Sequence, residues 1–98
     1  MAAPASDRRR DADRTRRDIL AVATSEFAER GYSGARVDEI AARTRTTKRM
    51  IYYYFGSKEG LYLAVLERAY AQIRQVERGI HIAELSPDEA LRLSLIHI

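Results

Sequence analysis

The side chains best suited to chemistry in this sequence are basic, and five of them fall in one short segment. Residues 43–58 contain no aspartate or glutamate, and their basic side chains are Arg43, Arg45, Lys48, Arg49 and Lys58. Guanidinium and ammonium groups donate charge-assisted hydrogen bonds to phosphate oxygens and to the edge of guanine. A basic block of this kind is typical of a surface that binds a polyanion.

No arrangement of residues is suited to catalysis or to holding a metal ion. The chain has no cysteine, which excludes disulfides, thiolate metal sites and a cysteine nucleophile. His81 and His97 have no ligand-type neighbours at metal spacing. Asp38 and Glu39 form an acidic pair in the first turn of a predicted helix, where they meet the helix dipole favourably. We therefore predict no enzyme activity, no metal and no cofactor.

Length and composition indicate one small folded domain. The 98 residues are 46% hydrophobic and 32% charged, an ordinary balance for a globular protein. The net charge of +3 arises in residues 1–17, which hold six arginines and three aspartates, because residues 18–98 hold eleven bases and eleven acids. This first segment has no apolar run typical of a signal peptide, and no stretch is long enough to span a membrane. We expect a cytoplasmic protein with no membrane association.

Hydrophobic periodicity predicts an all-α chain without repeats. Residues 1–12 lack periodicity and are predicted to form a disordered basic arm. Asp13 is the expected cap of a first helix, in which apolar residues recur at three- and four-residue spacings and Gly31 lies just past the end. After a turn over residues 31–35, a brief second helix ends near Arg43.

A third helix is predicted to begin at a cap formed by Thr46 or Thr47 and to run to about Tyr54. At 100° per residue, its two faces differ in chemistry. One face is basic and aromatic, with Lys48, Arg49, Tyr52 and Tyr53, and the other is more apolar, with Thr47, Met50, Ile51 and Tyr54. Two short helices joined by a three- or four-residue turn have the geometry with which a second helix enters a major groove of DNA.

The basic residues of this unit have expected roles that follow from their chemistry. Lys48 and Arg49 are expected to contact guanine edges or phosphates, and Thr47 to add a hydroxyl contact. Lys58, in the first turn of the next helix, is expected to bind a phosphate together with the backbone N–H groups there. The alternative interpretation of these cations is a solvated helix face, since exposed lysine and arginine are common.

The aromatic run divides into two pairs. Tyr52 and Tyr53 are expected to bond phosphates through their hydroxyls, with Tyr52 the stronger candidate. Tyr54 and Phe55 are expected to be buried, and core packing is the alternative interpretation of the whole run.

Two further helices follow. Ser57 is the predicted cap of a longer helix that ends around Gly79, with an apolar stripe at Leu61, Val65, Ala69, Ile73 and Val76. The sequence Ser86-Pro87-Asp88-Glu89 is a capping box with proline at the first helical position, so a fifth helix is predicted to begin there. We expect a helix-turn-helix unit over residues 13–56, and over residues 57–98 the fourth helix and the start of the fifth.

Three blocks of sequence resemble the N-terminal domain of TetR-family regulators. They begin at Ile19-Leu20, continue through Phe27 to Tyr32 and Val37 to Ala41, and end with Thr47 to Glu59, where Tyr-Tyr-Tyr-Phe-Gly-Ser-Lys-Glu is the most specific part. The resemblance covers residues 14 to about 70. It implies a homeodomain-like three-helix helix-turn-helix domain over residues 13–56, followed by a longer fourth helix and the start of a fifth. Residues 57–98 would then hold this fourth helix and the truncated start of a ligand-binding and dimerisation domain. It also implies DNA contacts at Thr47, Lys48, Arg49, Tyr52, Tyr53 and Lys58.

The partners are likewise those that the resemblance implies. They are double-stranded DNA with a palindromic operator, a second copy of the chain in a homodimer, and a small-molecule effector in a C-terminal domain that is mostly missing here. The expected function is that of a sequence-specific regulator, a repressor released by its effector, in the bacterial cytoplasm and at the nucleoid.

Two positions depart from the family pattern. Where the family usually has glycine in the turn between the second and third helices, this chain has Arg45, for which a positive φ carries strain. Arg45 and its neighbour Thr46 are counted among the candidate DNA contacts. Where the family usually has serine or threonine before the second helix, this chain has Ala35 and Arg36, so the usual cap is missing and Arg36 is expected to touch the DNA backbone.

The alternative function is a helical protein-interaction module without specific DNA binding. Its support is the unusually apolar C-terminal end, residues 93–98. This end also resembles translated sequencing-adaptor sequence, so one interpretation is a non-native terminus. A membrane-surface role for the arginine arm is a weaker alternative, because too little apolar area accompanies the arm.

Overall fold

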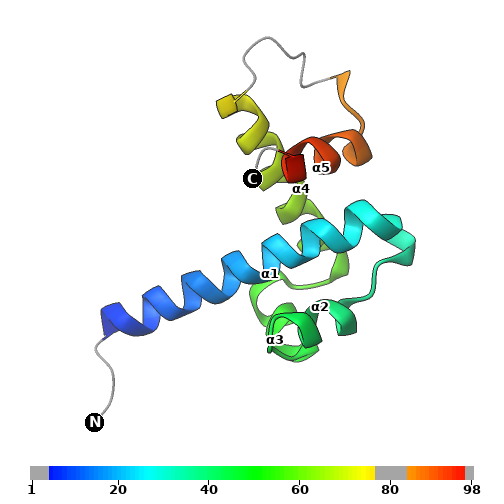
Figure 1. Cartoon of the computed structure of the whole chain (residues 1–98). Coiled ribbons are helices and arrows are strands. Elements are labelled where there is room, and N and C mark those ends of the chain that lie inside the picture. Colours follow the sequence, from blue (N-terminus) through cyan, green and yellow to red (C-terminus); the bar gives the residue numbers. More distant parts are fainter. Residues whose placement is uncertain (1–4, 77–83, 97–98) are drawn as a thin grey trace.

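The computed structural model describes residues 5–76 and 84–96, and over these ranges it contains α-helices but no strand (Figure 1). Residues 1–4, 77–83 and 97–98 are not described. The all-α prediction is confirmed. The helices are α1 (Ala5–Gly34), α2 (Val37–Arg43), α3 (Lys48–Phe55), α4 (Lys58–Val76) and α5 (Pro87–Ile96).

The N-terminal part of α1 differs from the prediction. The helix begins at Ala5, so the disordered arm is wrong for residues 5–12 and Asp13 lies inside the helix instead of capping it. Alanine and arginine are good helix formers, and Asp13 is four residues from both Arg9 and Arg17, a spacing that stabilises helices. Figure 1 shows this part of α1 extending beyond the other helices toward the N-terminus.

The main body of α1 ends where the sequence indicated. Gly31 has φ 72° and ψ 176°, values that interrupt the helix. Glycine reaches positive φ without the steric cost that other residues meet. Residues 31–35 were expected to be a turn, but a short helical segment follows the break and ends at Gly34.

All five helices contribute side chains to one hydrophobic core. Phe27 of α1, Ile40 of α2, Ile51 of α3 and Leu61 of α4 are all completely buried within it. Burial of one such side chain contributes roughly 1.5–3 kcal/mol to folding. Because Ile51 is buried in this way, α3 is fixed in orientation about its own axis, and its opposite side faces solvent.

The later helices follow the predicted pattern. Ser57 caps α4 by accepting a hydrogen bond from the Gly60 backbone N–H at 3.0 Å, and the first four residues of the predicted stripe are buried. The expected end near Gly79 lies outside the described residues. At the start of α5, the Ser86 N–H donates to Glu89 Oε1 at 3.1 Å and the Glu89 N–H donates to Ser86 Oγ at 3.2 Å. This reciprocal pair is the predicted capping box.

Among the described helices, none is both long enough and apolar enough to cross a membrane.

Candidate nucleic-acid interface

The first turn of α3 is fixed by its own sequence. Thr47 is the N-cap, with extended backbone (φ −118°, ψ 156°), and its side-chain oxygen accepts a hydrogen bond from the Met50 N–H at 3.1 Å. The sequence predicted either Thr46 or Thr47 as the cap, and in the structure the cap is Thr47. Its side chain is exposed at the start of the helix that carries the basic residues.

The turn between α2 and α3 is a Schellman motif closed by arginine. The Thr46 N–H donates to Ala41 O at 3.0 Å, and the Arg45 N–H donates to Ala42 O at 3.4 Å. Arg45 has φ 56° and is the one non-glycine residue with positive φ in the described ranges. The positive φ expected at this position is therefore present, and its usual cost for a non-glycine residue is about 1–2 kcal/mol.

Thr44 stabilises the same turn through its side chain. Its hydroxyl donates to Ile40 O at 2.8 Å and lies 2.9 Å from the hydroxyl of Thr46. Thr46, which the sequence placed among the DNA contacts, is half-buried and has this internal partner. Its hydroxyl is therefore less available to DNA than that of Thr47.

The start of α2 depends on a residue that the sequence reasoning missed. Arg36 is the N-cap and its side chain makes no capping hydrogen bond, as the absence of serine or threonine predicted. Its backbone N–H instead donates to Glu26 Oε2 of α1 at 2.9 Å. Glu26 is only 1% exposed, and its carboxylate also lies 3.4 Å from Arg30 Nε and 4.0 Å from Arg43 Nη1.

A signal for Glu26 is present in the sequence. It lies three residues after Ala23 and beside Phe27, on the side of α1 that the apolar spacing assigns to the core. Acidic residues are almost never fully buried without partners. A carboxylate on an otherwise apolar face therefore indicates a specific polar contact.

The exposed side of α3 is as basic as predicted, but the division between its faces is less sharp. Ile51 is fully buried, whereas Met50, expected on the packing face, is 40% exposed. Tyr54 and Phe55 are half-buried and pack against the core without being enclosed by it. An eight-residue helix at the surface has too few neighbours to cover all of its apolar residues.

The two candidate tyrosines differ in access. Tyr53 is 77% exposed, and Tyr52 is half-buried against the core. Tyr52 also lies beside Lys48, whose Nζ is 5.9 Å from the centre of the ring. Tyr53 is therefore the more exposed of the two, and the preference for Tyr52 as a phosphate contact stays a prediction.

Lys58 lies at the start of α4 over an aromatic cluster. Its Nζ is 4.9 Å from the ring centre of Tyr32, and this ring stacks with Phe27 and meets Tyr62 edge-on at 5.0 Å. The attraction between a cation and a ring face holds Lys58 near its place. This compensates for placing a cation at the positive end of a helix dipole.

All nine predicted contact residues lie in the stretch from Arg36, just before α2, to Lys58, the first residue of α4. Three of them are half-buried: Thr46, Tyr52 and Lys58. The other six are exposed: Arg36, Arg45, Thr47, Lys48, Arg49 and Tyr53.

The helix-turn-helix region matches a known protein family. Residues 19–65 match the profile of a family described as bacterial regulatory proteins, tetR family. The chain carries the N-terminal domain of the TetR family. All nine candidate contacts lie within the matched residues, whereas the first 18 residues lie outside them. No solved structure gives a significant match to the chain.

Relatives of this TetR-family chain have names that describe regulators. The repressor NicS of Pseudomonas putida is 44% identical over 85 residues, which are 87% of this chain and 40% of NicS. The repressor SCO4008 of Streptomyces coelicolor is 46% identical over 59 residues, 60% of this chain and 31% of that protein. The activator FasR of Mycolicibacterium smegmatis is 46% identical over 56 residues, 57% and 26% of the two chains.

This chain therefore spans less than half the length of each of these relatives. TetR-family proteins of this kind are transcriptional regulators and not enzymes, in agreement with the absence of catalytic motifs in the sequence. Within the described residues, no group of three or more acidic or histidine side chains is placed to hold a metal ion. His81 and His97 lie outside those residues.

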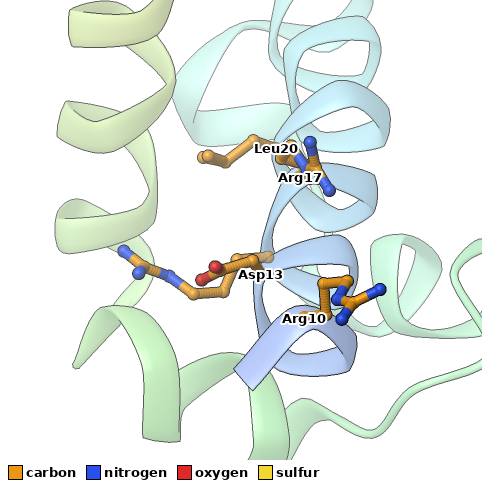
Figure 2. A pocket seen from close by; sticks show the side chains of 5 residues that line it. Arg10, Asp13, Arg17 and Leu20 are labelled. Carbon is orange, nitrogen blue, oxygen red and sulfur yellow. The ribbon is translucent and has the colours of Figure 1, made fainter. Parts of the chain in front are cut away.

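Six arginines in the N-terminal half of α1 precede the residues of the TetR-family match. A shallow cavity of about 330 Å³ lies along α1, lined by Arg10, Asp13, Arg16, Arg17 and Leu20. Figure 2 shows Leu20 pointing toward α4, with Arg10 and Arg17 on the side of α1 away from it. The Arg16 guanidinium lies 5.9 Å from the ring centre of Phe55, at the end of α3. This contact joins the basic part of α1 to the helix-turn-helix.

Proposed function

We propose that this chain is the DNA-binding part of a sequence-specific transcriptional regulator, in which α3 enters the major groove. The observation that supports it is the orientation of α3. The buried Ile51 directs one side of the helix to the core, and the exposed Lys48 and Arg49 lie on the surface. A short helix with donors on its outer side, preceded by a second short helix and a tight turn, meets the requirements for direct contact with base edges.

In this proposal the candidate residues have separate tasks. Lys48 and Arg49 contact base edges and so provide specificity. The remaining residues position the helix by contacting phosphates and carry no sequence information directly. They are Arg36, Arg45, Thr46, Thr47, Tyr52, Tyr53 and Lys58.

The assembly of the whole regulator is part of the same proposal. Two copies form a homodimer on a palindromic operator, so that two α3 helices lie one helical turn apart. Residues 57–98 contribute α4 and the start of the domain that binds a small-molecule effector and mediates dimerisation. We propose repression released by that effector, because NicS and SCO4008 are named repressors, although FasR is named an activator. Such a regulator acts at the nucleoid in the bacterial cytoplasm.

Substitution of the two base-contacting residues tests the proposal. The 98-residue chain first selects duplexes from a random pool, and the affinity for the selected duplex is then measured for Lys48→Ala and Arg49→Ala. Loss of a guanine contact is expected to cost about 1–3 kcal/mol and to relax preference at one base position.

Arg74→Ala is the matched control for this experiment. It removes one positive charge from an exposed position in the last turn of α4, away from the helix-turn-helix. Its affinity is expected to stay within about twofold of the original, since a distant exposed charge is largely screened. Unchanged binding in both Lys48→Ala and Arg49→Ala would contradict the assignment of α3.

Salt dependence separates DNA binding from the alternative of a protein-interaction module. Phosphate contacts release counterions, so affinity for duplex DNA is expected to fall steeply as salt is added. The exposed apolar residues Leu63, Leu95 and Ile96 are the features that favour the alternative. Association with a protein that salt does not weaken, together with no affinity for DNA, would support it.

A further inference from the structure

An acidic residue of α2 lies beside the first basic residue of α3. Asp38 Oδ1 is 3.9 Å from Lys48 Nζ, and the two side chains are 65% and 52% exposed. Asp38 belongs to the first turn of α2 and Lys48 begins α3, so the pair joins the two helices across the turn. The Lys48 ammonium is held between this carboxylate and the Tyr52 ring.

This pairing distinguishes Lys48 from the other proposed contacts. Of the basic residues in the acid-free segment 43–58, Arg43 pairs with the buried Glu26 and Lys48 pairs with Asp38. The other three cations of the segment form no ion pair within the described ranges. Asp38 is therefore the one described carboxylate that lies within ion-pair distance of a proposed base-contacting side chain.

The ion pair between Asp38 and Lys48 has different consequences for binding to non-specific DNA and for binding to the operator. Non-specific affinity comes almost entirely from contacts between cations and phosphates. For Lys48 to reach a phosphate it must leave Asp38, and the negative carboxylate then remains close to the negative backbone. In the groove, a base edge offers Lys48 neutral acceptors. The carboxylate can stay beside the ammonium there and hold it in the direction of the bases.

We propose that Asp38 is a specificity-determining residue that withholds Lys48 from phosphates and reserves it for base edges. The inference rests on the proposed function of α3. It extends that function by assigning to α2 a negative charge that weakens binding to DNA of the wrong sequence. Specificity gained by a repulsive element is a general strategy of binding proteins.

Asp38→Asn removes the charge and keeps the shape of the side chain. The 98-residue chain and this variant are compared on two probes, the duplex that the original chain selects from a random pool and poly(dI-dC). We expect non-specific affinity to rise about two- to fivefold, the range set by an exposed ion pair. Its salt dependence should steepen by about 0.9 in slope, equivalent to one more phosphate contact. Affinity for the selected duplex should change less than twofold.

Glu39→Gln is the matched control, because Glu39 is the next residue of the same helix turn, is exposed, and forms no ion pair among the described residues. It makes the same change in net charge, so it should raise both affinities by the same factor. In a Lys48→Ala background, Asp38→Asn should no longer change the ratio of the two affinities. Thermal unfolding should be nearly unchanged, since an exposed pair contributes little to stability.

The outcomes are distinct. A fall in the ratio of specific to non-specific affinity in Asp38→Asn, absent in Glu39→Gln and absent without Lys48, supports the inference. An equal change on both probes, or no change on either, overturns the inference and leaves the proposed function in place. If the original chain selects no sequence from the pool, the proposed function fails and the inference fails with it.

Discussion

The two helices of the helix-turn-helix begin in different ways. At the start of α3, the Thr47 side chain caps the helix by accepting a hydrogen bond from the backbone N–H of Met50, three residues later. At the start of α2, the side chain of Arg36 supplies no cap, and the acceptor comes from Glu26, ten residues earlier in the chain and on another helix. The cap of α3 is therefore local in sequence, whereas the cap of α2 depends on tertiary structure. The helix that is proposed to enter the groove can therefore form its first turn by itself, whereas its supporting helix is held by α1.

The largest expected effect comes from breaking the start of α2. Glu26→Ala removes the acceptor for the Arg36 N–H and leaves a cavity in the core, so we expect a loss of about 3 kcal/mol in the free energy of unfolding. Chemical denaturation followed by circular dichroism measures it. Glu26→Gln keeps an acceptor and loses only the charge, and it should cost less.

A second substitution tests whether the lost cap of α2 is the reason for the lower stability of Glu26→Ala. Arg36→Thr gives α2 a local cap of the kind that α3 has. In the Glu26→Ala background it should recover about 1 kcal/mol, the usual contribution of an N-cap. The same substitution alone should have a smaller effect, because Glu26 already satisfies the backbone. If Arg36→Thr recovers nothing in the double variant, the carboxylate stabilises the fold through Arg30 and Arg43 instead.

Breaking the start of α3 is expected to cost less. Thr47→Ala removes the acceptor for the Met50 N–H, with a loss of about 1 kcal/mol. Hydrogen exchange should show faster exchange of the Met50 amide while the α2 amides stay protected, because the defect is local. Thr47→Ser is the control that retains the hydroxyl and should behave like the original chain. Equal loss of protection in both helices would mean that the two starts are not independent.

These contrasts explain what the sequence could and could not predict. The bounds of α2 and α3, the cap by Ser57 and the capping box at Ser86 follow from residues within four positions of one another. The contact between Glu26 and Arg36 could not be located in this way, since it requires the packing of α1 on α2. Composition was also misleading for residues 5–12, where charged residues suggested disorder but their spacing supports a helix.

A substitution in the turn between α2 and α3 is expected to stabilise the fold, unlike the substitutions at the two helix starts. Arg45→Gly removes the strain of a positive φ, so we expect an increase of about 1 kcal/mol in the free energy of unfolding. This corresponds to a rise of about 4–8 °C in Tm for a domain of this size. If Arg45 contacts a phosphate as proposed, the same variant should bind DNA less tightly despite its greater stability. Arg45→Asn is the control, because asparagine tolerates positive φ but carries no charge.

The smallest expected effect on stability concerns the start of α5, where Ser86 and Glu89 form two reciprocal hydrogen bonds. The hydrogen bonds from Ser86, first that of its backbone N–H, lower the pKa of the exposed Glu89 below its ordinary value of 4.5. Since the pKa is lowered in the folded chain, the stabilisation is present at and above pH 4.5 and is lost as the pH falls through the lowered pKa. The Ser86 amide resonance should therefore shift in acid, as followed by NMR between about pH 7 and 2.5. Glu89→Gln keeps a capping box that cannot titrate, and its Ser86 amide should not show this transition; a shift of equal size in this variant would assign the transition to another group.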